Sequence, residues 1–240
     1  GGLKGHGVEV VAATHVEPDD AADALAGNGP AISAITAGGH GGALTDDDDL
    51  LHMPPGATAF TMDSDTARDV LTSLPRGVHA GPFGIDYAHL RALGADDIAY
   101  GLFFPILRSL GRGECPTFLR PHLLASELFG VPKGQSDRIR PIAVASSLSR
   151  VIGKIISRQL GPRIGAAVGP FQFLVGVPGG AETAVHAHEI WLDSHPDHIS
   201  VGQDARNAYN SMSRRQMASG VRRAFPELLP WFQLCYGQAS

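Results

Sequence analysis

Apolar residues recur with helical spacing through much of the chain from residue 87 onward. The clearest case lies between residues 148 and 160, where Lys154 and Arg158 stand opposite an apolar face. That face consists of Leu148, Val151, Ile152, Ile155, Ile156 and Leu160. The same spacing predicts helices over residues 87–93, 100–110 and 183–192. A further helix is predicted from Ser213, where Met217, Val221 and Phe225 lie four residues apart.

Shorter segments, rich in β-branched residues or alternating apolar and polar ones, predict strands over residues 128–131, 139–144 and 199–203. The first two segments are separated by Gly134-Gln135-Ser136-Asp137, a sequence typical of a turn, and together they predict a hairpin. We therefore expect an α+β fold that is mainly helical with short antiparallel strands.

Charge divides the chain near residue 70. Residues 1–70 hold 2 basic and 12 acidic side chains, a net charge of −10, whereas residues 71–240 hold 17 and 12, a net charge of +5. Glycine clusters and a run of four aspartates make residues 1–70 an acidic extension or linker. Residues 71–240 form the predicted folded domain, and their arginine-rich positive charge favours contact with phosphate.

Composition also bears on the cell compartment. Cys115 and Cys235 lie far apart without a Cys-x-x-Cys spacing, which favours reduced thiols in an intracellular protein. No apolar run is long enough for a membrane span, so we expect no membrane partner.

Asp204 follows the predicted strand 199–203 directly. A carboxylate at the end of a strand is well placed to hold a divalent cation such as Mg²⁺, which prefers oxygen ligands. The alternative is an aspartate that only caps the turn between a strand and a helix.

Lys133 and Arg140 flank the predicted hairpin turn, so a hairpin would bring the two cations together. A lysine acts as a point charge and an arginine as a fork of paired donors, a combination that suits a triphosphate. The alternative is an exposed hairpin with solvated charges.

Four blocks then occur in a characteristic order. They are Gly77 to Ile85 with its Gly-Pro-x-Gly turn, Gly130 to Lys133 followed by Arg138 to Val144, Gln172 to Glu182, and Asp204 to Asn210. In this order and at this spacing the blocks resemble reverse transcriptases of the non-LTR retrotransposon type. The resemblance covers residues 71–240 and implies right-hand polymerase fingers and a partial palm.

The resemblance also implies roles for single residues. Asp204 would be the catalytic metal ligand, with Mg²⁺ or Mn²⁺ as the cofactor of the complete enzyme. Lys133, Arg140, Ala205 and Tyr209 would bind the nucleotide, and the Tyr209 ring would exclude a 2′-hydroxyl or simply pack on the palm core. Contacts with nucleic acid are implied at Gly81, Pro82, Arg138 and Gln172.

The implied activity is RNA-directed DNA polymerisation with an RNA template, a DNA primer and deoxynucleoside triphosphates, in the nucleus if the element is eukaryotic. Glu227 is the only acidic residue after Asp204, so the later Asp-Asp pair of the family has no counterpart here. We therefore expect this chain alone to be inactive, with the remaining palm and the thumb supplied by the same polyprotein. The alternatives are a non-catalytic nucleic-acid-binding module and a decayed retroelement relic.

Overall fold

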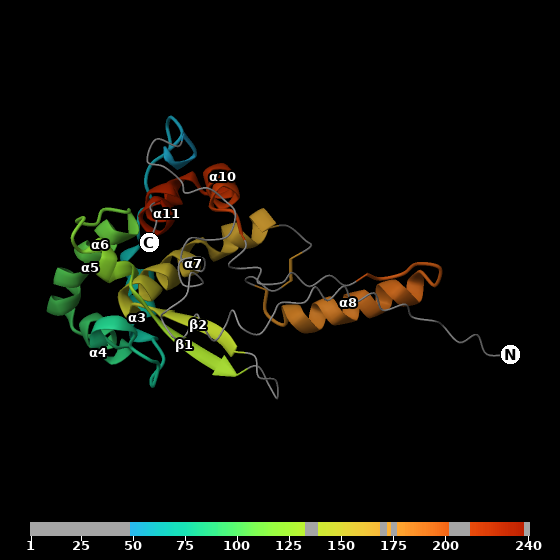
Figure 1. Ribbon diagram of the computed structural model, residues 1–240, viewed down its shortest axis with the longest axis horizontal. Coiled ribbons are helices and arrows are strands. Elements are labelled where there is room, and N and C mark those ends of the chain that lie inside the picture. Colours follow the sequence, from blue (N-terminus) through green and yellow to red (C-terminus); the bar gives the residue numbers. More distant parts are fainter. Residues whose placement is uncertain (1–48, 133–138, 169–171, 174–176, 202–211, 238–240) are drawn as a thin grey trace. The chain divides into compact units, whose positions relative to one another are not determined.

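The computed structural model describes residues 49–132, 139–168, 172–173, 177–201 and 212–237 (Figure 1). These residues belong to two compact units, and each unit is described by itself. The larger unit contains the described residues up to 161 and from 212 onward, and the smaller unit contains those between 162 and 201.

Three helices form the first part of the larger unit: α3 (Ser64–Thr72), α4 (Tyr87–Ala95) and α5 (Asp97–Gly111). Each begins behind an aspartate whose carboxylate accepts a backbone N–H: Asp63 from Thr66 at 2.7 Å, Asp86 from Ala88 at 2.8 Å, and Asp96 from Ala99 at 2.7 Å. Such caps satisfy amides that have no partner inside the helix. The helices α4 and α5 confirm the predictions over 87–93 and 100–110.

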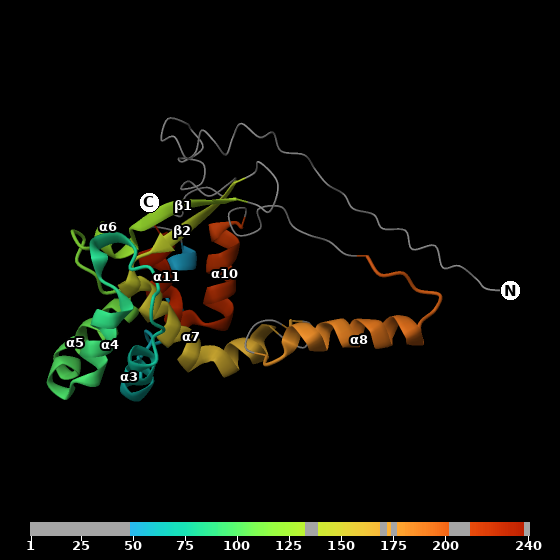
Figure 2. The same cartoon turned by 90° about the horizontal axis from the view of Figure 1, so that it is seen from below.

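The long helix α7 (Ser147–Val168) confirms the prediction over 148–160 and supplies much of the core. Five of the six predicted face residues are buried: Val151, Ile152, Ile155, Ile156 and Leu160. The Gln159 side chain ties α7 to the segment before α3, because its amide donates to Thr61 O at 2.8 Å and its carbonyl accepts from Asp63 N at 3.0 Å. In Figure 1 and Figure 2 alike, α4 lies beside α5 in the larger unit.

A β-hairpin precedes α7, as predicted. The strands β1 (Ser126–Pro132) and β2 (Ile139–Ala145) pair antiparallel in a two-stranded sheet, from Ser126 opposite Ala145 to Pro132 opposite Ile139. The short helix α6 (Arg120–Leu124) leads into β1, and a 3-10 turn, η2 (Pro82–Gly84), leads into α4.

The end of the chain closes the larger unit with α10 (Arg214–Ala224), η3 (Pro226–Leu228) and α11 (Leu229–Tyr236). The helix predicted from Ser213 is α10, with the Ser213 hydroxyl as its N-cap. Buried Ala218 and Phe232 pack with Leu51 of η1 (Asp49–Leu51). The predicted boundary near residue 70 falls inside α3, and the buried side chains of Phe60 and Met62 belong to the core. Residues 1–48, the greater part of the predicted acidic extension, lie outside the described residues.

The smaller unit contains the end of α7 and the helix α8 (Gly180–Ser194), which confirms the helix predicted over 183–192. The strand predicted over 199–203 is not found in its described part, because residues 199–201 have no strand conformation. A strand needs a hydrogen-bonded neighbour, and β1 and β2 pair with each other and with no other segment that the structure describes. The described helices include none that is long and apolar enough to cross a membrane.

Candidate nucleic-acid interface

The predicted nucleotide and metal residues fall largely outside the described part of the chain. This applies to Lys133, Arg138, Asp204, Ala205 and Tyr209. Arg140 lies in β2, where its backbone pairs with Val131. Of the contacts predicted on the hairpin, the structure therefore describes only the backbone of Arg140, and the grouping of these residues into one site stays a prediction.

Gly81 and Pro82 form a turn that packs closely on the end of β2. Gly81 has a φ of 75°, and a Cβ atom built on it would lie 2.6 Å from the Ala145 carbonyl oxygen. Only glycine fits this backbone conformation at this distance. The structure thus gives Gly81 a packing role, while its contact with nucleic acid stays a prediction. Gln172 is half-buried and belongs to the smaller unit, and its contact with nucleic acid also stays a prediction.

The same turn holds the start of α7. The Ser147 hydroxyl donates to the Ala80 carbonyl at 2.5 Å. The Arg150 guanidinium donates to the carbonyls of His79 at 2.6 Å and Ala80 at 3.1 Å. These bonds fix the Arg150 side chain against the turn before any ligand arrives.

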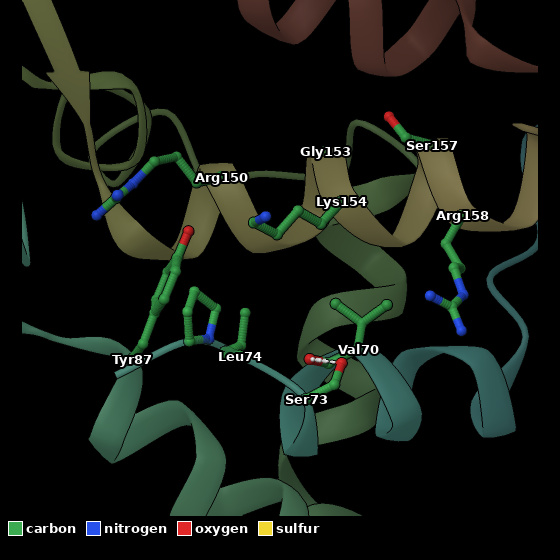
Figure 3. Close-up of a pocket in the computed structure, with 10 residues that line it drawn as sticks. Val70, Ser73, Leu74, Tyr87, Arg150, Gly153, Lys154, Ser157 and Arg158 are labelled. Atoms are coloured by element: carbon green, nitrogen blue, oxygen red, sulfur yellow. Dashed lines mark hydrogen bonds between the residues drawn. The ribbon is translucent and has the colours of Figure 1, made fainter. Parts of the chain in front are cut away.

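Arg150 stands at one end of a pocket of about 610 Å³ between α3, α4 and α7 (Figure 3). Five of the described lining residues come from α7, and the others come from the end of α3, the segment after it and the start of α4. They are Val70, Ser73, Leu74, Pro75, Tyr87, Arg150, Gly153, Lys154, Ser157 and Arg158.

The charge of this pocket is positive. Arg150, Lys154 and Arg158 lie four residues apart and so share one face of α7, whereas the lining residues that the structure describes include no acid. Lys154 and Arg158 are exposed and form no hydrogen bond or ion pair with any described residue. Their charges are therefore uncompensated within the described part of the chain.

Arg150 differs from its two neighbours because it is held in place. Its guanidinium carbon lies 4.9 Å from the centre of the Tyr87 ring, a cation–π contact. Its Nε atom is buried and has no hydrogen-bond partner in the part of the chain that the structure describes. The pocket thus combines one fixed and two free cations, an arrangement suited to binding an anion.

In the sequence, Lys154 and Arg158 stand opposite the apolar face of this helix, and no function was predicted for them. The repeat of cations at positions 150, 154 and 158 is the signal that points to this site. Leu74 and Tyr87 form the other walls of the pocket, because α3 and α4 lie beside α7 in the fold. No sequence pattern predicts that these two residues lie near α7.

A second pocket, of about 850 Å³, lies among α6, the base of the hairpin, α10 and α11. Arg150 lines this pocket as well as the first one. The other two cations bind the protein itself, because Arg120 Nε donates to Leu234 O at 3.0 Å and Arg214 donates to Tyr236 O at 3.5 Å. Burial raises the pKa of the Cys235 thiol in its wall to about 12. The thiol is therefore protonated at neutral pH and is a poor nucleophile.

The described residues do not fit a magnesium centre. No group of three His, Cys, Asp or Glu side chains among them is arranged to hold a metal ion. Asp204, which lies outside the described residues, has the right kind of donor atom, but one carboxylate is too few for the two ions of a nucleotidyl transfer site.

Comparisons of the chain with protein-family models, with curated proteins and with solved structures find no match. We therefore infer its function from its own residues and their arrangement.

Proposed function

We propose that this chain forms the fingers and the beginning of the palm of an RNA-directed DNA polymerase of the non-LTR retrotransposon type. It would act on an RNA template and a DNA primer, with deoxynucleoside triphosphates as substrates. The observation that carries this proposal is the antiparallel hairpin β1–β2, which leads within two residues into α7.

On this proposal the two triphosphate contacts, Lys133 and Arg140, would lie near the same end of the hairpin. Val131 pairs with Arg140, and Pro132 pairs with Ile139, which is the last pair that the structure describes. Lys133 is the next residue in the sequence. On this proposal the register would continue past Pro132, and positions 133 and 140 would be diagonal neighbours about 7–8 Å apart. Two long cationic side chains at that separation would reach neighbouring phosphates of one triphosphate.

The Gly-Pro-x-Gly turn supports the same proposal. It packs on Ala145 at the end of β2 and on the first turn of α7. Two blocks of the resemblance, separated by some sixty residues in the sequence, are thus in contact in the fold. This contact would hold the base of the hairpin steady while its tip engages a nucleotide.

For the metal ion, the proposal names one ligand and no catalytic step. Asp204 would supply one oxygen donor to a Mg²⁺ or Mn²⁺ ion, and bound metal would stabilise the charge that develops on the triphosphate. Further carboxylates are needed for two ions, and we assign no catalytic step to the described residues. On this proposal the chain by itself does not extend a primer.

One observation favours a second candidate, a nucleic-acid-binding module without catalysis. The positive pocket on α7 needs neither Asp204 nor a metal ion. For such a module, salt-dependent RNA binding would be unchanged by Asp204→Ala, and no binding of deoxynucleoside triphosphates would be found.

The test is photo-cross-linking of the chain to a deoxynucleoside triphosphate with a photoreactive base, in the presence of Mg²⁺. We expect saturable cross-linking that is lost in the double variant Lys133→Ala/Arg140→Ala. The matched control, Arg108→Ala/Arg223→Ala, removes two exposed cations from other helices and should retain it. Unlabelled deoxynucleotide should compete better than ribonucleotide, and Tyr209→Ala should abolish that preference.

Equal cross-linking in both double variants would show that the hairpin is not the nucleotide site. Absence of saturable cross-linking in the unaltered chain, together with RNA binding, would favour the non-catalytic module.

A further inference from the structure

We propose that the pocket between α3, α4 and α7 binds the phosphate backbone of a nucleic-acid strand. None of its described lining residues belongs to β1 or β2, so this site is separate from the predicted nucleotide contacts. The inference rests on the proposed function for one point only, the choice of nucleic acid as the class of polyanion.

The cations form a line rather than a cluster. Positions 150, 154 and 158 of a helix that rises about 1.5 Å per residue are separated by about 6 Å, and the whole line is about 12 Å long. A nucleic-acid strand carries one phosphate per nucleotide, so three cations in a line can meet successive phosphates of one strand. A free phosphate ion would engage only one part of it.

The pocket is built to attract such a strand and to hold it. Arg150 is fixed by the carbonyls of His79 and Ala80 and by the Tyr87 ring, so little side-chain entropy is lost when it meets a phosphate. Lys154 and Arg158 have no competing partner among the described residues. A concave surface with charges of one sign raises the local concentration of polyanions.

The space beside the cations is also available to a strand. No atom lies within 4 Å of the position that a Cβ atom on Gly153 would take, so the backbone of α7 is open to the pocket there. Leu74 provides an apolar wall opposite the helix (Figure 3), which suits the sugar or base of a nucleotide. Pro75 also lines the pocket. The Ser157 hydroxyl adds a group of the kind that commonly contacts phosphate oxygens.

The test fills the pocket without touching its cations. Gly153→Glu adds a negatively charged side chain to a residue that lines the pocket, and its Cβ atom would meet no side chain or neighbouring element within 4 Å. The matched control is Gly101→Glu in α5, another helical glycine with nothing within 4 Å of its Cβ position. Both changes add one negative charge and remove one helical glycine. Binding of a labelled single-stranded RNA is measured by fluorescence anisotropy, and folding by circular dichroism.

We expect Gly153→Glu to weaken RNA binding about tenfold or more, and Gly101→Glu to change it by less than about threefold. A second pair of variants measures the contacts themselves. Lys154→Gln/Arg158→Gln should lower the slope of log K against log salt by about 1.4, because each phosphate contact with a single strand contributes about 0.7. Arg108→Gln/Arg223→Gln should leave the slope close to that of the unaltered chain.

Equal weakening by Gly153→Glu and Gly101→Glu, or equal salt slopes in the two glutamine variants, would overturn the proposal. If Gly153→Glu unfolds the chain, the salt slopes decide. Cross-linking of the deoxynucleotide at the hairpin is measured separately, so failure of the proposed function and failure of this inference can be distinguished.

Discussion

The helix α7 follows the hairpin, and α8 follows a turn. The two helices differ in how much of their surface is buried. α7 buries a continuous face from Val151 to Leu160, whereas Gly180 is the only residue of α8 that is buried. Val185, Ile190 and Trp191 of α8 are exposed. Because isolated helices of this length are marginal in water, packing of one face accounts for most of the stability of a helix in a protein.

The difference matters for binding. A line of cations recognises phosphates well only if the helix beneath it is rigid. In α7 the buried face anchors the helix, so the opposite face can present Arg150, Lys154 and Arg158 at fixed spacing. The charged residues of α8 have no such support, and no pocket among those described is lined by them. We therefore expect recognition at α7 and little at α8.

Hydrogen exchange should show the largest contrast between the two helices. Amides of residues 151–160 should exchange only through global unfolding, whereas those of residues 184–194 should exchange through local opening, orders of magnitude faster. Mass spectrometry of peptides from the exchanging protein measures both helices in one sample. Equal protection would mean that α8 is packed as firmly as α7 and would break the comparison.

Core truncation should give the next largest contrast. Ile155→Ala removes a fully buried side chain and should lower the free energy of unfolding by about 2–5 kcal/mol. Val185→Ala removes an exposed side chain of α8 and should change it by less than about 0.5 kcal/mol. Urea titration measures both. Similar losses would show that α8 contributes a core face of its own.

The turn that holds the start of α7 should be sensitive to a single methyl group. Gly81→Ala introduces a Cβ atom 2.6 Å from the Ala145 carbonyl in a left-handed conformation, and should cost about 1–3 kcal/mol. Gly84→Ala is the matched control, since Gly84 also has a positive φ but has nothing within 4 Å. Thermal unfolding should rank Gly81→Ala as the more destabilising change, and the reverse order would contradict the packing of this turn on β2.

Helix caps should give the smallest effect, and it should depend on pH. Hydrogen bonds from the backbone amides of His89 and Ala88 hold the pKa of Asp86 below its ordinary value of 3.8. A lowered pKa in the folded state means that the cap stabilises α4 above pH 3.8 and that this contribution is lost as the pH falls through the folded pKa. The N-cap of α8, Gly179, forms no side-chain bond and has no such dependence.

Asp86→Asn keeps a capping side chain that does not titrate. The melting temperature of the unaltered chain should therefore exceed that of the variant at neutral pH, and the gap should close below pH 3.8. A gap that stays constant or widens on acidification would show that the charge of Asp86 does not stabilise α4.

Much of the fold could be predicted from local patterns. The period of Ile152, Ile155 and Ile156 identifies α7, and the turn residues between two apolar segments identify the hairpin. The strand predicted before Asp204 was wrong over residues 199–201, because alternation alone does not supply a pairing partner. The helix α3 was not predicted, since its acidic sequence is typical of a linker and its stability comes from packing with α4. The pocket joins Leu74, Tyr87 and Lys154, and only tertiary structure brings such distant positions together.

The most direct test of the proposed polymerase assignment is whether Asp204 binds metal together with a nucleotide. Electron paramagnetic resonance can follow free Mn²⁺ as the chain is added, with and without a deoxynucleoside triphosphate. We predict that the chain binds the Mn²⁺–nucleotide complex more tightly than Mn²⁺ alone, and that Asp204→Asn abolishes this gain. Equal binding by the unaltered chain and the variant, under both conditions, would contradict the assignment and would leave Asp204 as a residue of the turn.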